Sequence, residues 1–231
     1  MDILYVLLLL TMVFSIVVQV KVSSTFNRYA GIRAGKGKTG FEVARRILDA
    51  HGLFDVRIER VHGHLTDHYD PRARILRLSD SVYDNSSASA VGVAAHEVGH
   101  AIQHAVSYRP IVWRTKLVPA VSFASKFSWI AILLGVLITF SSYVLGSYIL
   151  AVGIVLFAAT TLFHLVTLPC ELDASRRALC ELELCGWYSR DELGMSREVL
   201  RAAAMTYVAA LATSVIQLLR LLQIFANSKR D

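Results

Sequence analysis

The chain alternates between long apolar runs without charge and segments in which charged residues are frequent. Residues 3–20 form an uncharged apolar run that is long enough to cross a bilayer as one helix. No Asp, Glu, Lys or Arg occurs between Lys126 and Glu171, a stretch about twice the length that one span needs. The pattern therefore predicts a membrane anchor over 3–20 and a transmembrane hairpin over 127–168.

A fourth apolar run begins near residue 202. It is less hydrophobic than the others, because Thr206, Thr213, Ser214 and Gln217 interrupt it. We predict a helix over 202–226 that either spans the membrane or packs half-buried against the other helices.

The segment 21–126 has the mixed pattern of a small α+β domain. Thr39 and Glu42 have the spacing of a capping box and predict a helix start. Polar residues over 85–89 offer N-caps for a second helix that runs to about residue 106. Alternating apolar positions predict three short strands between these helices, near residues 56–58, 65–69 and 75–78.

Composition and charge support a membrane protein. Hydrophobic residues make up 55% of the chain and charged residues only 18%, which argues against a purely soluble or a disordered chain. The net charge is +6, but no nucleic-acid motif occurs, so we expect no nucleic-acid partner. Of the 24 Lys and Arg residues, 16 lie within 21–126. The positive-inside rule places this domain on the cytoplasmic side, with the plasma membrane of a bacterium as the expected location.

The sequence His96-Glu97-Val98-Gly99-His100 is an HExxH motif and carries the candidate chemistry. Residues four apart share one face of a helix, so His96 and His100 can bind one metal ion. Zn²⁺ in a catalytic site takes three protein ligands and keeps one position for water. Glu97 can then act as the general base that activates the zinc-bound water. Gly99, between the two histidines, permits the close approach of another element.

A third ligand is expected from the segment 169–201, where Pro169 favours the start of a helix. Two acidic residues, Glu171 and Asp173, lie in the first turn of that predicted helix. They point to different faces, so we expect one of them to bind the metal. We favour Glu171, because Asp173 has Arg176 and Arg177 as alternative partners.

These motifs resemble those of the YugP-type membrane zinc metallopeptidases and, more distantly, of the HtpX-like gluzincin membrane peptidases. The similarity extends over HEVGHAIQ, the earlier GHLTDHYDPR, the later LVTLPCELDASRRAL and AAAMTYVAA near the C-terminus. The resemblance implies a membrane-anchored zinc peptidase with Glu171 as the third ligand. The wider group carries an acidic residue four positions after that glutamate, where this chain has Ser175. Asp173 is therefore a candidate for the partner that orients a ligand histidine.

The resemblance also points to His68 and Tyr69 as residues near the zinc. Either side chain could donate a hydrogen bond to the oxyanion of the transition state, while the alternative is a structural role in a hairpin. Three histidines in seven residues (His62, His64 and His68) also make a second metal site conceivable, although a polar surface loop explains them as well.

The sequence thus predicts a mainly α membrane protein with three or four transmembrane helices and a small α+β zincin-like catalytic domain. The predicted function is zinc-dependent hydrolysis of peptide bonds, with peptides or membrane proteins as substrates and the lipid bilayer as surroundings. A strand near residues 74–78 could hold an extended peptide. Two alternatives remain: a zinc-binding membrane scaffold or holdase that cleaves nothing, and a subunit of a channel or transporter.

Overall fold

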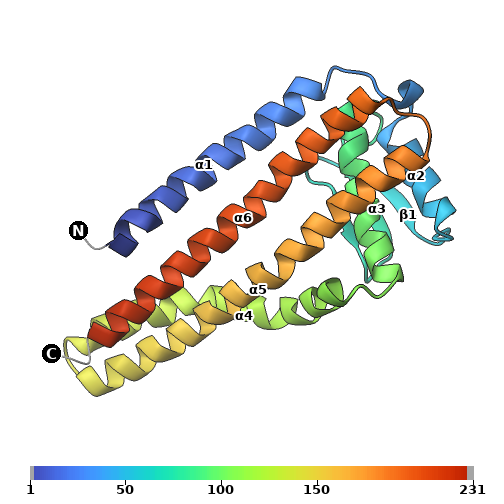
Figure 1. The fold of residues 1–231 in the computed structure, drawn as a ribbon. Coiled ribbons are helices and arrows are strands. Elements are labelled where there is room, and N and C mark those ends of the chain that lie inside the picture. Colours follow the sequence, from blue (N-terminus) through green and yellow to red (C-terminus); the bar gives the residue numbers. More distant parts are fainter. Residues whose placement is uncertain (1–2, 228–231) are drawn as a thin grey trace. The chain divides into compact units, whose positions relative to one another are not determined.

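The computed structural model describes residues 3–227, which are mostly helical (Figure 1). Four helices are much longer than the rest, and a short three-stranded sheet lies between the first and second of them in the chain. In order, the elements are α1 (Ile3–Tyr29), the 3-10 turn η1 (Gly35–Gly37), α2 (Gly40–Ala50), β1 (Arg57–Val61), β2 (His68–Asp70), β3 (Ile75–Ser79), α3 (Ala88–Ala105), α4 (Arg109–Thr139), α5 (Tyr143–Leu184) and α6 (Arg190–Asn227).

These elements form two compact units, and α1, α4, α5 and α6 each contribute to both. The first, which we call the apolar-helix unit, contains residues 3–17, 112–168 and 207–227. The second, the mixed unit, contains residues 18–111 and 169–206. The predicted domain boundary at residue 126 stays a prediction, and it falls within α4, which runs from Arg109 to Thr139.

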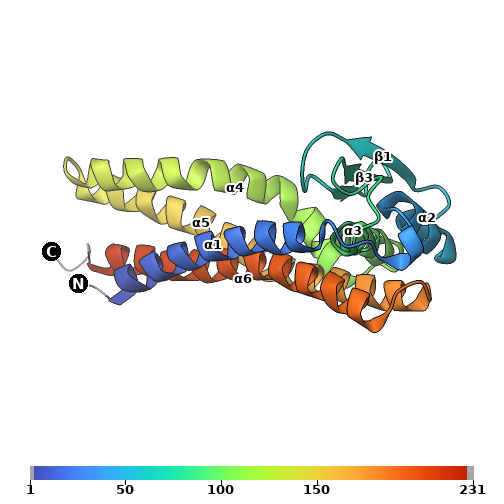
Figure 2. The same ribbon diagram turned by 90° about the horizontal axis from the view of Figure 1, so that it is seen from above.

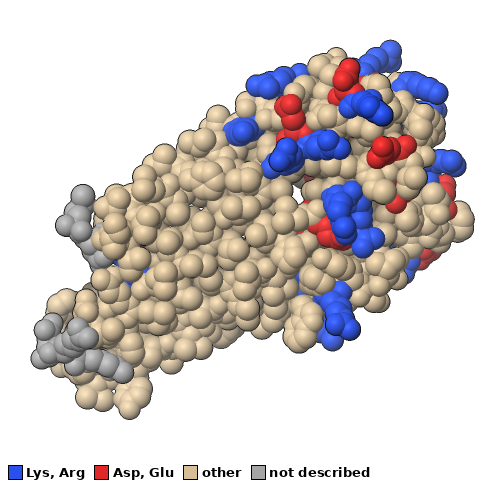
Figure 3. Space-filling model, in the orientation of Figure 1, with Lys and Arg blue, Asp and Glu red and all other residues tan. Residues whose placement is uncertain are grey.

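The apolar-helix unit has the character of a membrane-spanning bundle. All four long helices are long and apolar enough to cross a bilayer. They include α6, which contains the less hydrophobic fourth run. The face of this unit that Figure 3 shows carries almost no Lys, Arg, Asp or Glu, in contrast to the face of the mixed unit. The α4–α5 hairpin packs tightly, since the Cα of Gly135 faces the backbone of Leu150. Ser15 contacts Thr213, and Tyr5 packs against Arg220, so α1 and α6 run antiparallel.

In the mixed unit, α2 and α3 pack against each other and both contact the sheet, α2 at β1 and α3 at β2 and β3. The strand order is β1-β3-β2, with β1 parallel and β2 antiparallel to β3. Figure 2 shows β1 beside β3. A single core joins these elements to the ends of α5 and α6 that lie in this unit, through buried side chains such as Val98, Leu182 and Val199. The core therefore fixes α3 against α5, the two helices that carry the candidate metal ligands.

The local signals in the sequence predict the ends of α2 and α3 well. Thr39 and Glu42 form the reciprocal capping box at the start of α2. Ser87 caps α3 by accepting a hydrogen bond from the N–H of Ala90, and the helix ends at Ala105 as expected. The three predicted strands are also present, within a few residues of the expected positions.

Two local predictions are wrong. Pro169 does not begin a helix but lies inside α5, which continues from the apolar-helix unit into the mixed unit. Proline inside a helix removes the hydrogen bond to the carbonyl four residues earlier, yet long helices that leave a membrane tolerate this loss when neighbouring groups compensate. The strand near 74–78 is the central strand β3, so its backbone pairs with β1 and β2 and is not available for a peptide.

Gly99 shows why a small residue stands between the two histidines. A Cβ atom at this position would lie 2.7 Å from the carbonyl oxygen of Ala174 on α5, a distance that requires one backbone to move. The close approach that the sequence predicted is therefore confirmed, and it sets the separation between α3 and α5.

We expect Gly99→Ala to destabilise the protein by about 1–3 kcal/mol through overpacking, even though alanine favours helix formation. Gly194→Ala is the matched control, because Gly194 is also helical and a Cβ there meets no atom within 4 Å. The control should be neutral or more stable by up to about 1 kcal/mol. Thermal unfolding of both variants in detergent measures the difference. Equal unfolding temperatures would contradict the proposed packing constraint.

Candidate metal centre

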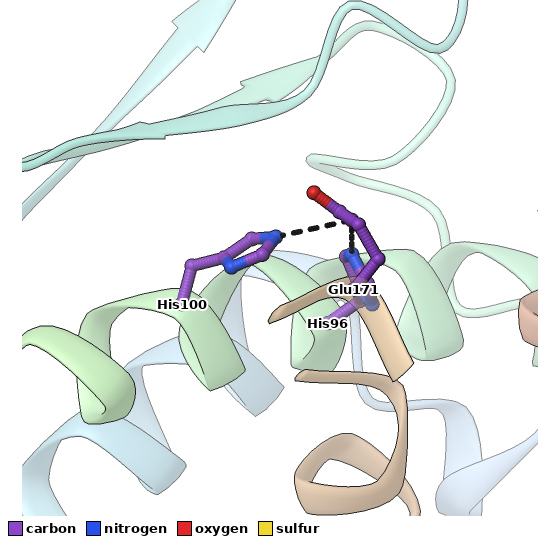
Figure 4. Close-up of side chains that lie close together, drawn as sticks. All are labelled: His96, His100 and Glu171. Carbon is purple, nitrogen blue, oxygen red and sulfur yellow. Dashed lines mark hydrogen bonds and ion pairs between the residues drawn. The ribbon is translucent and has the colours of Figure 1, made fainter. Parts of the chain in front are cut away.

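Three side chains converge where α3 passes α5 in the mixed unit. His96 and His100 project from adjacent turns of α3, and Glu171 reaches them from α5 (Figure 4). Glu171 Oε2 lies 3.3 Å from His96 Nε2 and 3.5 Å from His100 Nε2. His100 and Glu171 are buried, and His96 is half-buried. The structure therefore brings together the two histidines and the acidic residue that the sequence favoured.

The spacing of these atoms fits a tetrahedral metal ion. Zinc bonds of about 2.0–2.1 Å at tetrahedral angles separate neighbouring ligand atoms by roughly 3.3 Å. The two separations from Glu171 Oε2 match this value, whereas charge-assisted hydrogen bonds are shorter, at about 2.7–2.9 Å. Two imidazoles and one carboxylate are also a known donor set of catalytic zinc sites. Among the described residues, this is the one group of three such side chains that could hold a metal ion.

Each histidine has a second partner on its other ring nitrogen. His96 Nδ1 lies 3.1 Å from the hydroxyl of Ser175, which occupies the position where the wider group has an acidic residue. His100 Nδ1 lies 3.0 Å from Oε1 of Gln103. The amide of Gln103 in turn donates to Asp173 Oδ2 at 2.9 Å. Asp173 is therefore linked to His100 through Gln103, and it contacts Arg176 and Arg177 as well.

The electrostatic environment keeps both acidic residues ionised. Burial alone would raise the pKa of Glu171, but the adjacent imidazole rings of His100 and His96 outweigh burial and lower it. The pKa of Asp173 is also lowered, because Arg177, Gln103 and Arg176 outweigh the opposing effect of burial. Both residues lie in the part of α5 that belongs to the mixed unit, beyond the apolar run that ends at Leu168. An ionised Glu171 is the form that binds a cation.

Glu97 is half-buried on α3, next to His96. It has an acidic neighbour, Asp67, which the sequence analysis did not single out. Burial raises the pKa of Asp67, and the charge of Glu97 raises it further, although hydrogen bonds from Ser79 act in the opposite direction. Asp67 accepts these bonds from the backbone N–H of Ser79 at 2.7 Å and from its hydroxyl at 2.9 Å. Asp67 thus ties the start of β2 to the end of β3, close to Glu97.

The other predicted residues have contacts of their own. His68 is exposed, with Nδ1 2.9 Å from the carbonyl oxygen of Thr66. Tyr69 is half-buried and packs its ring against His104. The oxyanion role of these two residues stays a prediction. The second metal site is not found among the described residues, since His62 contacts Asp80 and His64 packs against Phe26.

No motif in the sequence indicated that Gln103 contacts His100 and Asp173. It follows His100 by three positions, so the two side chains share a helix face. A buried polar residue is expected to have hydrogen-bond partners, and this rule would have linked Gln103 to the motif if its burial had been predicted. Ser175 stood out in the sequence only because the wider group of peptidases has an acidic residue at this position.

Comparison with known proteins agrees with this geometry. A family model described as "Putative neutral zinc metallopeptidase" matches residues 4–226. The chain is 47% identical over 214 residues to "Putative membrane protease YugP" of Bacillus subtilis (strain 168), and the alignment covers 92% of each chain. No solved structure matches significantly.

Proposed function

Because the chain belongs to the family described as "Putative neutral zinc metallopeptidase", we propose that it is a membrane-anchored zinc endopeptidase. The convergence of His96, His100 and Glu171 is the observation that carries this proposal. These three residues are the proposed zinc ligands, and Glu97 is the proposed general base. The alternative, a zinc-binding scaffold or holdase, would need the same ligands but no base beside them.

The proposed chemistry divides between the metal and the chain. When bound, zinc lowers the pKa of water and polarises the scissile carbonyl group. Glu97 takes a proton from the attacking water and delivers it to the leaving amine. Ser175 and Gln103 hold the two histidine rings through their Nδ1 atoms. The buried carboxylate of Glu171 supplies the negative charge that a divalent cation requires.

An extended substrate fits the outer strand β2 better than the strand that the sequence suggested. β2 pairs with β3 on one side only, and it packs near α3, which carries the HExxH motif. A peptide could therefore add to β2 by backbone hydrogen bonds. Membrane anchoring makes segments of membrane proteins the proposed substrate class.

Purified protein in detergent tests the proposed function. We expect about one zinc ion per chain and cleavage of an unfolded protein such as casein. Loss of cleavage after zinc is removed by a chelator, with recovery after zinc is restored, would link the two properties. A protein that binds zinc but cleaves neither casein nor any of a panel of unfolded membrane proteins would support the scaffold instead.

The proposed topology places the mixed unit in the cytoplasm. In this proposal the α4–α5 hairpin crosses the membrane twice and returns the chain to the side from which it left, so both segments of the mixed unit would lie on that side. We predict that Cys180, an exposed thiol of the mixed unit, reacts with a membrane-impermeant maleimide only after cells are permeabilised. In a variant without its native thiols, Ser141→Cys in the exposed α4–α5 turn should react in intact cells. The reverse pattern would show the opposite topology.

A further inference from the structure

Gln103 is a fully buried amide that links the two helices of the candidate metal centre. It lies on α3, one turn after His100, and its side chain reaches α5. There its nitrogen donates to the carbonyl oxygen of Cys170 at 2.8 Å and to Asp173 Oδ2 at 2.9 Å. Both partners flank Glu171 in the sequence. The side chain of Gln103 therefore connects His100, one proposed ligand, to Cys170 and Asp173, which flank Glu171, another proposed ligand.

These contacts fix the orientation of the amide. A carbonyl oxygen and a carboxylate oxygen can only accept, so the atom of Gln103 that faces them must be the NH₂ group. The opposite atom, which lies 3.0 Å from His100 Nδ1, is then the amide oxygen. An amide oxygen has no proton to give, and His100 Nδ1 must be the donor. The Nε2 atom of a neutral His100 consequently presents its lone pair toward Glu171.

The geometry assigns Gln103 as a positioning residue that selects the Nδ1–H tautomer of His100 and aims Nε2 at the metal. This inference rests on the proposed zinc site but not on peptide cleavage. A ligand histidine can bind through either nitrogen, and the hydrogen bond at the other nitrogen decides which one is available. A neutral His100 would offer its Nε2 lone pair 3.5 Å from the carboxylate of Glu171, an arrangement that a cation bound between them would stabilise.

The surroundings keep Gln103 in this orientation. Arg177 Nε donates to Asp173 Oδ2 at 2.6 Å, and Arg176 pairs with the other carboxylate oxygen. Asp173 therefore remains an acceptor and cannot exchange roles with the amide. His96 differs, because the hydroxyl of Ser175 can donate or accept and so leaves the tautomer of that ring open. We therefore expect Gln103 to fix the tautomer of His100 more strongly than Ser175 fixes that of His96.

The test compares Gln103→Met with Gln19→Met in the full-length protein in detergent. Methionine keeps the length of the side chain but offers no amide, and Gln19 is exposed on α1. Competition with a chelator of known zinc affinity should show a zinc Kd raised about 10–100-fold in Gln103→Met, as for other residues that support a ligand. The control should match the parent, and Ser175→Ala should have the smaller effect. A zinc Kd within twofold of the parent in Gln103→Met would overturn the inference.

A second measurement does not depend on Gln103→Met and decides the case if that variant does not fold. Nitrogen-15 NMR of histidine rings in the zinc-loaded parent, assigned through a His100→Gln variant, reports which nitrogen carries the proton. We expect a slowly exchanging Nδ1–H signal for His100, with Nε2 on the metal. Coordination through Nδ1 would refute the inference. A parent that binds zinc in this way but cleaves no peptide would refute the peptidase alone.

Discussion

Replacing Glu97 with glutamine is expected to abolish peptide cleavage while zinc remains bound. Glutamine has the same shape but cannot accept the proton of the attacking water, and a positioned general base contributes about 10²–10⁴-fold to such reactions. The three proposed ligands, His96, His100 and Glu171, are unchanged in this variant. We therefore expect kcat to fall by about that factor, with one zinc ion per chain in both proteins. Casein cleavage and zinc analysis on the same samples measure the two properties.

The control for this experiment is Glu183→Gln, which makes the same chemical change at an exposed position on α5. Its activity and zinc content should equal those of the parent. If Glu97→Gln cleaved casein at the rate of the parent, the role of Glu97 as base would be wrong. If it lost zinc together with activity, the effect would be on the metal and the assignment of roles would need revision.

Replacing Glu171 with alanine is expected to remove the metal. The variant leaves two histidines with no negative charge between them, and the buried carboxylate is 3.3–3.5 Å from both Nε2 atoms. We expect zinc affinity to fall by more than about 100-fold, beyond the 10–100-fold that outer residues contribute. Asp173→Asn, the change at the rival acidic residue, should fall within that smaller range. Chelator competition on the purified variants gives both values.

The comparison also decides between the two acidic residues that the sequence left open. Asp173 bonds Gln103, Arg176 and Arg177, so its removal weakens the support of His100 without removing a ligand. A larger loss of zinc affinity in Asp173→Asn than in Glu171→Ala would mean that the third ligand is misassigned. Glu183→Ala serves as the exposed control on the same helix.

The parts of the fold that depend on local chemistry could be predicted from the sequence. The capping box of Thr39 and Glu42 and the cap at Ser87 depend on a few neighbouring residues, and both are present. The apolar runs gave the long helices, because hydropathy over about 20 residues reports membrane-spanning segments directly. The HExxH spacing also placed His96 and His100 on one helix face.

The parts that depend on tertiary contacts could not be predicted. The order of three short strands is not encoded in their alternation, so β3 could be mistaken for an outer strand. The effect of Pro169 depends on whether the surroundings stabilise a continuous helix, and here α5 continues through it. Gln103 acquires its role only when α5 brings Cys170 and Asp173 beside α3. No pattern along α3 alone indicates those partners.

X-ray absorption at the zinc edge of the purified protein tests the central claim most directly. The account predicts two imidazole nitrogens at about 2.0–2.1 Å, further oxygen ligands from Glu171 and water, and no sulfur. The Glu171→Ala variant, loaded with excess zinc, should lose the carboxylate oxygen. A zinc–sulfur distance of about 2.3 Å would contradict the account, because a cysteine, such as the buried Cys170 next to Glu171, would then be a ligand.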